Sequence, residues 1–438
     1  MEPIVDLPLW SLIPFVLMLL TIAIAPLFAD AWWGKNVNKL YVSLILGIPT
    51  AIYLICVGLG VNLEHQILYD YLPFIILLAS LFVVTGGIHM QGNLYARPST
   101  NTAILAIGYV LASLTGTTGA AMLLIRPLLA TNKERKYTTH TVLFFIAAVA
   151  NCGGLLTPLG DPPLFLLFLR GASFTWFLNL FPAWLLVGVL LLTTYYILDS
   201  YWFKRESLTR LKSDARSQEP IRIKGDVNFL FLFLIILTVA FVNAGYIPAM
   251  GEEDAPILIK YLREIALCVI IALSLMFTHR QVRIDNNFTW NPIIEVAVVF
   301  LGIFITMTPA MLYLKGHAAS LGLTEPWQFF YSAGMLSSVL DNAPTALAFH
   351  GVASGLVASG AAAAEVAGIP EVLLKAIALG SVMFGAMTYI GNGPNFMVKA
   401  IAEESGFRMP SFFGYIWKFS LRVLLPIYVL VQLIFFFF

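Results

Sequence analysis

Ten apolar runs constrain the fold of this 438-residue chain more than any other feature of its sequence. An α-helix needs about 20 apolar residues to cross the hydrocarbon core of a bilayer, and each run has roughly that length. Only 11% of the residues are charged, whereas a soluble domain carries about 25% charged residues. The bilayer is therefore the expected solvent for most of the chain. The runs lie near residues 9–28, 40–60, 72–90, 139–168, 174–198, 227–246, 263–278, 292–313, 372–400 and 411–437.

The composition also excludes several classes of function. With 25 Lys and Arg against 24 Asp and Glu, the chain lacks the basic excess of a nucleic-acid-binding protein. Cys56, Cys152 and Cys268 each lie in an apolar run, without the spacing of a metal site or of a disulfide framework. The expected partners are the lipid bilayer and small inorganic ions, with no nucleic acid and no bound cofactor. A homodimer is left open.

Two further apolar stretches, 101–129 and 326–358, are interrupted at mid-length by "TGTTGA" and "LDNAPTA". Polar and helix-breaking residues in the middle of an apolar segment predict a re-entrant hairpin, which enters and leaves the membrane by the same face. The expected fold class is an all-α polytopic membrane protein. It has about ten transmembrane helices plus two re-entrant hairpins, arranged in two inverted-topology repeats.

The charge of the loops supports the two hairpins. If both stretches are re-entrant, most lysines and arginines fall in loops on one side, including Lys35, Lys39 and the cations of 199–226. Cytoplasmic loops carry such an excess, so this side is predicted to be inside and both termini outside. We expect a multi-pass protein of a bacterial inner membrane.

The basic loop at 199–226 is the only long polar stretch in the sequence. The predicted organisation is a first repeat at 1–200, a cytoplasmic connector at 201–226 and a second repeat at 227–438. Each half reads as three spans, a hairpin and two spans. Because five crossings is an odd number, the second half runs inverted relative to the first.

A trace of duplication remains in the residues themselves. A shift of 231 positions aligns Gly154 with Gly385, Thr157 with Thr388, Gly160 with Gly391, and Pro163 with Pro394. Chance matches of common residues are the alternative, but these fall in one short segment at the same place in both halves. Inverted repeats with broken helices at matching positions are typical of secondary transporters, whose site lies near the midplane where the breaks meet.

Asp161 and Asp341 are the strongest candidates for chemistry, because each is an acid beside a helix break in a membrane-embedded element. Burying a carboxylate there costs several kcal/mol unless it is protonated or paired with a cation. One group can therefore hold either a proton or a metal cation, and competition between them gives exchange. The alternative is structural: Asp161 caps the following helix, and Asp341 satisfies backbone groups at the hairpin turn.

Freed backbone carbonyls and neutral side-chain oxygens surround both breaks. The segments 151–163 and 388–395 are rich in glycine and proline, so neither can remain a regular helix. Such oxygen-rich surroundings suit a hard cation such as sodium, which we expect at Asp161 and Asp341. For the threonines, hydrogen bonds to their own helices are the alternative. The neutral side chains expected to contribute are Asn151, Thr157, Thr117, Thr118, Asn342, Asn392 and Asn395.

Two titratable groups outside the breaks are further candidates. Glu295 lies just inside the apolar run "EVAVVFLGIFITM" and is either a proton relay or an acid that reaches for the interface. His350 follows the second hairpin tip and is a candidate for pH sensing.

Three stretches, "GGLLTPLGDPPLF", "SSVLDNAPTALAFHG" and "EVAVVFLGIFI", resemble the ArsB/NhaD permease family of the ion transporter superfamily. The resemblance covers the whole chain. It implies two inverted repeats with re-entrant hairpins, an elevator-like motion of a transport domain, and function for Asp161, Asp341 and Asn342. The implied protein is a transporter rather than an enzyme, working by sodium (or lithium)/proton antiport or by arsenite efflux.

Sodium or lithium/proton antiport is the function that these observations favour, with efflux of arsenite or another anion as the alternative. Carboxylate transporters of the superfamily carry Ser-Asn-Thr at both hairpin tips. This chain has Gly116 and Thr117 at the first tip, and Asp341 and Asn342 at the second, which argues against citrate or succinate. An intramembrane aspartyl protease fits less well, because Pro158 stands where its Gly-x-Gly-Asp signature needs glycine.

Overall fold

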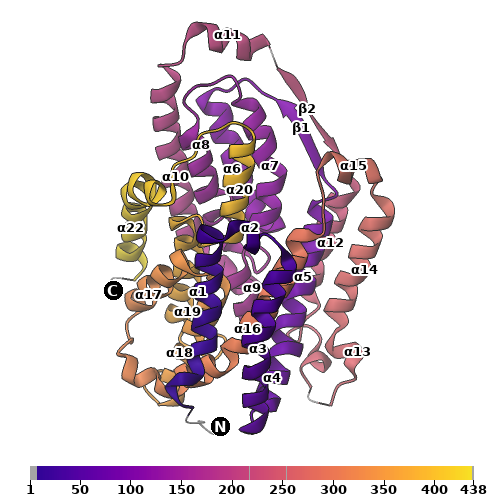
Figure 1. The fold of residues 1–438 in the computed structure, drawn as a ribbon, viewed down its shortest axis with the longest axis vertical. Coiled ribbons are helices and arrows are strands. Elements are labelled where there is room, and N and C mark those ends of the chain that lie inside the picture. Colours follow the sequence, from indigo (N-terminus) through magenta and orange to yellow (C-terminus); the bar gives the residue numbers. More distant parts are fainter. Residues whose placement is uncertain (1–6, 217, 253, 437–438) are drawn as a thin grey trace. The chain divides into compact units, whose positions relative to one another are not determined.

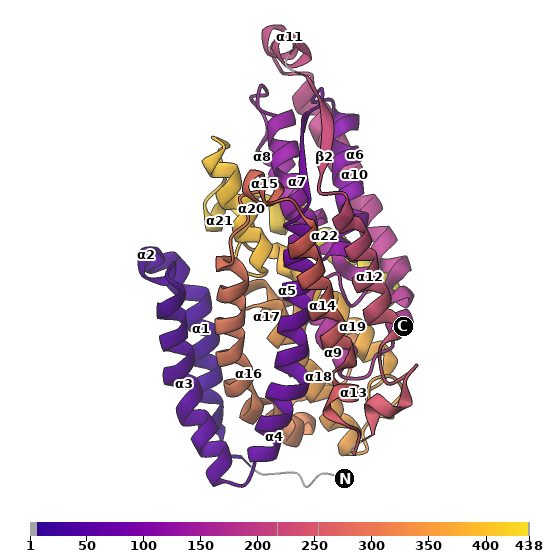
Figure 2. The same ribbon diagram turned by 90° about the vertical axis from the view of Figure 1, so that its right-hand side faces the viewer.

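A computed structural model describes residues 7–216, 218–252 and 254–436, and most of these residues lie in helices (Figures 1 and 2). The prediction of an all-α polytopic membrane protein is confirmed. Among the described residues, seven helices are long and apolar enough to span a bilayer. The predicted placement of both termini outside concerns residues 1–6 and 437–438, which lie outside the described part of the chain.

The difference between ten predicted runs and seven long helices has a local cause. The runs near 227–246 and 263–278 form helices of 15 and 16 residues. The run near 372–400 is interrupted between Phe384 and Gly393. The number of spans and the two repeats therefore remain predictions.

Two compact units make up the chain, and each takes segments from both sides of the basic connector. Unit 1 comprises Met1–Leu78, Pro162–Ala172 and Thr289–Phe384. Unit 2 comprises Ala79–Asp161, Ser173–Phe288 and Gly385–Phe438. The two units are groups of residues that contact one another, whereas the predicted repeats describe a duplication of the sequence. The units therefore do not test the proposed boundaries at 200 and 226, which remain a prediction.

Unit 1 is a helical assembly built around the long helix α16. Helix α5 begins in this unit and ends in unit 2. The elements of unit 1 are η1 (Leu9–Leu12), α1 (Ile13–Phe28), α2 (Asp30–Trp33), α3 (Asn36–Cys56), α4 (Gly60–His65), the π-helical η2 (Gln66–Tyr71), α5 (Leu72–Thr85), α9 (Pro162–Leu169), α16 (Asn291–His317), η6 (Ala318–Leu321), α17 (Pro326–Val339), α18 (Asn342–Ala358) and α19 (Glu371–Phe384).

Helix α3 shows how the sequence is adapted to lipid. Its exposed face carries Ile45 and Ile52, whereas its buried face carries Ser43 and Gly47. This polarity is the reverse of that of a helix in a soluble protein. Small buried residues let helices approach closely in a membrane, and Ser43 Oγ donates a hydrogen bond to the Val298 carbonyl of α16 at 2.9 Å.

Unit 2 contains the remaining helices and a two-stranded antiparallel sheet, in which His89 of β1 pairs with Lys224 of β2. Helices α12 and α14 lie side by side in both views (Figures 1 and 2). The elements of unit 2 are β1 (His89–Asn93), α6 (Pro98–Thr115), α7 (Thr117–Thr131), α8 (Thr139–Ala148), η3 (Cys152–Leu156), η4 (Phe174–Leu180), α10 (Phe181–Phe203), α11 (Leu208–Arg216), β2 (Glu219–Lys224), α12 (Val227–Phe241), η5 (Pro248–Gly251), α13 (Ile257–Lys260), α14 (Leu262–Phe277), α15 (Arg280–Asp285), η7 (Gly385–Met387), α20 (Gly393–Glu404), α21 (Phe412–Tyr415), the π-helical η8 (Ile416–Leu424) and α22 (Leu425–Phe435).

The first interrupted stretch forms a helical hairpin in unit 2. Gly116 alone joins α6 to α7, and its φ of 78° lies in the region that favours glycine. A Cβ atom on Gly108 would lie 2.9 Å from the side chain of Leu124. These residues stand at equal distances along the chain from Gly116, so α7 runs back alongside α6.

The second interrupted stretch folds back in the same manner in unit 1. Helix α17 ends at Val339, and α18 begins at Asn342 after a two-residue break. The rings of Phe329 and Phe349 lie 6.2 Å apart on the two helices. Both stretches are thus helical hairpins, and their re-entrant placement in the bilayer remains a prediction.

Candidate functional site

The break after α8 is a compact segment of unit 2 that contains only the short 3₁₀ helix η3. A Cβ atom on Gly160 would lie 1.9 Å from the carbonyl oxygen of Gly154, so only glycine permits this approach of backbone to backbone. The same segment meets the tip of the α6–α7 hairpin, where the Thr117 amide donates to the Gly160 carbonyl at 2.8 Å. Helix α7, the returning arm of the hairpin, therefore begins in direct contact with the break.

Asp161 lies where these segments meet, with only 1% of its surface exposed. Its Oδ1 atom accepts hydrogen bonds from Thr117 Oγ1 at 2.7 Å and from Asn392 Nδ2 at 3.1 Å. The hairpin tip and both helix breaks of unit 2 therefore converge on one carboxylate oxygen. Because Oδ1 already accepts from two donors, a proton bound by this carboxyl group belongs on Oδ2.

Three buried asparagines extend the cluster and link the two breaks. Asn392 Nδ2 lies 3.2 Å from Asn151 Oδ1, and Asn151 Nδ2 donates to Asn395 Oδ1 at 2.7 Å. Asn395 in turn donates to the carbonyls of Gly385 and Thr388, at 2.7 and 2.9 Å. The structure thus brings together the predicted residues Asp161, Thr117, Asn151, Asn392 and Asn395, all within unit 2.

Thr157 contacts the hairpin backbone. Its hydroxyl donates to the Ser113 carbonyl and accepts from the Leu159 amide at 3.2 Å. Ser113, which was not predicted, accepts from the Leu156 amide at 3.1 Å. These bonds join Thr157 to α6 and not to a helix of its own, so its contribution to a cation site remains a prediction. Thr118 lies half-buried beside Thr117 at the start of α7.

Asp341 occupies the N-cap position of α18 in unit 1. The side chain is half-buried, and its Oδ1 accepts from the Ala343 amide at 3.1 Å. Asn342 follows as the first residue of the helix and is buried. These contacts fit the structural alternative, yet the cap is a carboxylate where a neutral serine or asparagine would also serve. Asp341 lies in unit 1 and Asp161 in unit 2, so each carboxylate is described with the residues of its own unit.

The two outlying candidates have structural partners in unit 1. Glu295 is 47% exposed and lies 2.7 Å from Nζ of Lys39, which is 3% exposed. His350 is buried on α18, and its Nε2 lies 2.9 Å from the Ala367 carbonyl oxygen. Because a carbonyl only accepts, this nitrogen carries the proton. Roles in proton relay and pH sensing remain predictions.

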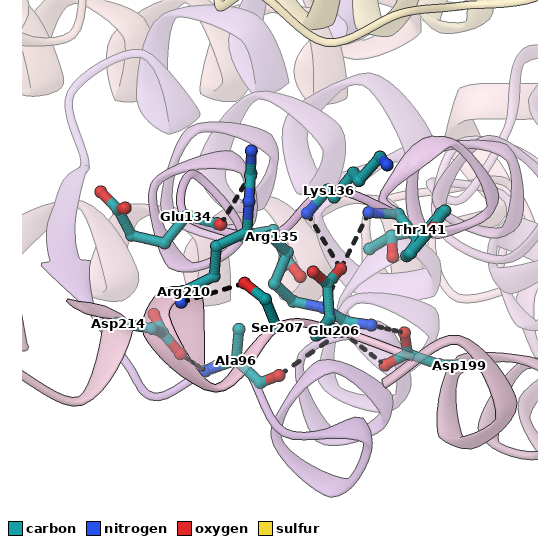
Figure 3. A network of polar contacts seen from close by, with 12 residues as sticks. Ala96, Glu134, Arg135, Lys136, Thr141, Asp199, Glu206, Ser207, Arg210 and Asp214 are labelled. Atoms are coloured by element: carbon teal, nitrogen blue, oxygen red, sulfur yellow. Dashed lines mark hydrogen bonds and ion pairs between the residues drawn. The ribbon is translucent and has the colours of Figure 1, made fainter. Parts of the chain in front are cut away.

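A second buried polar cluster lies in unit 2 at the end of α10 (Figure 3), and the sequence did not predict it. Asp199 is fully buried, and its Oδ2 accepts a hydrogen bond from Arg135 Nη1 at 3.1 Å. Its Oδ1 lies 2.7 Å from Arg135 Nη2 in the ion pair and 2.8 Å from His140 Nε2. Glu206 Oε1 accepts from two backbone amides of the neighbouring loop, each at 2.9 Å. An acid at the end of the apolar run 174–198 was the available signal, whereas Arg135 looked like an ordinary loop cation.

The donor set at Asp161 indicates which cation it suits. Among the described residues, no group of three or more His, Cys, Asp or Glu side chains is placed to hold a metal ion. The cluster instead offers one carboxylate together with a hydroxyl group and amides. Hard oxygen donors of low total charge suit an alkali cation better than a transition metal.

A helical membrane fold whose broken helices converge on a buried carboxylate is that of a membrane transporter of the secondary type. A family model with the description "Putative citrate transport" matches residues 4–436, and the chain belongs to this family. No curated protein matches the chain. The family match agrees with a transport function in general. It does not confirm the resemblance to the ArsB/NhaD family.

Proposed function

We propose that the protein exchanges sodium or lithium for protons, and that Asp161 binds either the cation or the proton. The observation that supports this proposal is the buried Asp161 carboxylate, held by Thr117 and Asn392 where both breaks of unit 2 meet. An isolated charge at such a site is costly, and either a proton or a cation removes that cost. Mutually exclusive occupancy couples the two flows.

The hydrogen bonds at Asp161 define what each residue contributes. Thr117 and Asn392 fix the carboxylate by donating to Oδ1, so that Oδ2 is the atom that exchanges its proton for the cation. The hydroxyl oxygen of Thr117 and the amide oxygens of Asn151 and Asn392 are the neutral ligands that would replace water around the cation. Prearranged oxygens lower the cost of dehydrating it.

Asp341 and Asn342 are the second part of the proposal. A carboxylate at the tip of a hairpin inside the bilayer can be neutralised in the same two ways. Its bond to the Ala343 amide holds one oxygen in place. We propose that this group binds a cation or a proton as unit 1's counterpart of Asp161, with alternating access provided by the elevator-like motion that the family resemblance implies.

The test uses purified protein in proteoliposomes that contain a pH-sensitive dye. Sodium or lithium added outside acid-loaded vesicles is expected to raise the internal pH, whereas potassium is not. Asp161→Asn and Asp341→Asn are expected to abolish the response. Asp254→Asn, which changes an exposed loop aspartate, is the matched control and should respond like the wild type. Normal exchange by Asp161→Asn would refute the assignment of Asp161.

Citrate transport is the second candidate, because the description of the family names it. Against it stand the two hairpin tips, Gly116-Thr117 and Asp341-Asn342, which lack the Ser-Asn-Thr sequence of carboxylate transporters. The same vesicles distinguish the candidates when radiolabelled citrate or arsenite is supplied under a sodium or proton gradient. Citrate accumulation without any sodium-driven pH change would replace antiport by citrate transport.

A further inference from the structure

We propose that the end of helix α14 in unit 2 binds the headgroup of an anionic phospholipid. Helix α14 ends at Phe277, and after two residues the short helix α15 begins at Arg280 (Figure 1). The predicted topology places this loop on the cytoplasmic side, where the membrane surface carries anionic lipids. The proposal concerns lipid binding and does not depend on cation exchange at Asp161.

Arg283 on α15 carries a charge without a counter-ion in the described part of the chain. Its Nη1 atom donates to the Val83 carbonyl at 2.8 Å, and its Nη2 atom donates to the carbonyl and the hydroxyl of Ser274, at 3.1 and 2.9 Å. Its Nε atom is buried and has no hydrogen-bond partner among the same residues. Because all of these acceptors are neutral, they fix the side chain but leave its charge unbalanced.

Further cations gather around Arg283. Arg280 precedes it by three positions on α15, so the two side chains are neighbours on the surface of the helix. Arg280 and His279 are both exposed. On the side of α7, Arg126 Nη1 lies 3.4 Å from the carbonyl oxygen of Asn286, which follows α15. We call the three arginines, together with His279, the basic cluster.

The acids near the basic cluster do not neutralise it. Asp285 lies 2.9 Å from Nζ of Lys224, so the charges of these two residues balance each other. Asp226 lies at the start of α12 and adds one further negative charge. Among the described residues of this region, the three arginines outnumber that acid. The surface therefore has a net positive charge, which attracts an anion.

An exposed apolar surface that suits acyl chains adjoins the basic cluster. Met276 and Phe277, the last two residues of α14, are 76% and 63% exposed. On the neighbouring helix α12, Phe233 is 55% exposed. The two helices are joined at this end, because Asn228 Nδ2 donates to Thr278 Oγ1 at 2.9 Å. Clustered arginines beside an apolar helix face on the cytoplasmic side match the headgroup and the chains of an anionic lipid.

A second copy of the chain suits this surface less well than a lipid does. In a two-fold dimer centred here the surface would meet itself, and the basic cluster of one copy would lie near that of the other. Like charges in close contact oppose such an association. An anionic phospholipid brings the opposite charge together with an apolar chain, so it complements both parts of the surface.

The experiment measures lipid binding to the purified full-length protein in neutral detergent by native mass spectrometry. Phosphatidylglycerol is compared with zwitterionic phosphatidylethanolamine of the same acyl chains. Phosphatidylglycerol is expected to bind more tightly, and added salt should weaken its binding because salt screens exposed charges. Arg280→Gln should lower the affinity for phosphatidylglycerol about fivefold, the contribution of one cation near an anionic surface. Arg216→Gln, which removes an exposed arginine of α11, is the matched control and should bind like the wild type.

A second variant keeps the test decisive. Arg280→Lys retains the charge and should retain the affinity, and thermal unfolding checks that each variant is folded. Equal binding of the two lipids, or equal affinity of Arg280→Gln and Arg216→Gln, would overturn the proposal. Displacement of the lipid by inorganic phosphate at the same concentration would assign the site to free anions instead. Asp161→Asn should keep wild-type lipid binding, so failure of the exchange mechanism can be distinguished from failure of this site.

Discussion

Asn392 donates a hydrogen bond to Asp161 at 3.1 Å across a separation of 231 positions in the chain. The same offset aligns the glycines and prolines of the two helix breaks. When a two-fold axis relates two parts of a structure, residues on the axis contact their own equivalents. A predicted inverted repeat would therefore place Asp161 and Asn392 on its pseudo-symmetry axis. One position has kept a titrating carboxyl group, and the other carries a permanent amide donor.

Loss of the Thr117 hydroxyl should weaken sodium binding. Thr117→Val removes one of the two donors that fix Asp161 Oδ1, and hydrogen bonds to charged groups contribute about 1.5–3 kcal/mol. We expect apparent sodium affinity in proteoliposomes to fall by roughly tenfold to a hundredfold. Thr117→Ser keeps the hydroxyl and serves as the control. Wild-type affinity in Thr117→Val would show that the hydroxyl does not position the carboxylate.

Two glycines in equivalent breaks should respond differently to alanine. In Gly160→Ala the new Cβ atom would stand 1.9 Å from the Gly154 carbonyl oxygen, a contact that neither backbone can avoid. In Gly393→Ala no atom lies within 4 Å of the new Cβ. Gly160→Ala should therefore lose folded protein in fluorescence-detected size-exclusion chromatography, whereas Gly393→Ala should elute as the wild type. Similar losses in both variants would contradict the described packing.

The buried ion pair of unit 2 should matter far more than an exposed one. Arg135→Ala leaves Asp199 buried without its charge partner, which costs about 3–5 kcal/mol. Lys399→Ala breaks an exposed pair with Glu403, and such pairs contribute less than about 1 kcal/mol. Thermal unfolding in detergent should separate the two variants clearly. Replacing Arg135 and Asp199 together by Met and Leu should cost less than Arg135→Ala alone, because Asp199 then no longer leaves a buried charge without its arginine.

Cation binding should depend on pH with a definite sign. In the proposed exchange the cation binds the deprotonated form of Asp161, so acidification is expected to weaken sodium binding once the carboxyl group takes up its proton. Linkage gives roughly a tenfold loss of affinity per pH unit for each proton displaced, and at higher pH the affinity should become constant. Calorimetry in buffers of different ionisation enthalpy counts the protons released. A count of zero at every pH would make the acid structural.

Both ends of the second hairpin should face the same side of the membrane. Glu325 precedes α17 and Ser359 follows α18, so cysteines placed at these positions report on the two arms. Cys56 and Cys268 are exposed and must first be replaced by serine, whereas Cys152 is buried. An impermeant thiol reagent is expected to label both positions from outside only. Labelling from opposite sides would refute the re-entrant hairpin.

Local sequence signals identified the breaks but not the pairing between distant segments. The glycines and prolines around Asp161 exclude a regular helix, so the break and its acid could be predicted from the residues themselves. Asp199 pairs with Arg135, which lies 64 positions earlier. The residues next to Asp199 and Arg135 in the sequence carry no pattern that predicts this contact. The division into two units is likewise a property of long-range contacts. The apolar runs near 227–246 and 263–278 contain helices of 15 and 16 residues, so whether each run spans the bilayer remains a prediction.

The link between Asp161 and Asn392 also sets an order for the biosynthesis of the protein. Asp161 leaves the ribosome 231 residues before the partner that donates to it, which corresponds to roughly 10–50 s at about 5–20 residues per second. Throughout that interval Asn151 also lacks Asn395, its partner from the second half. Unit 2 can therefore complete its packing only after the second break has been inserted. A chain released early would keep this acid in the membrane with its hydrogen-bond acceptors only partly satisfied.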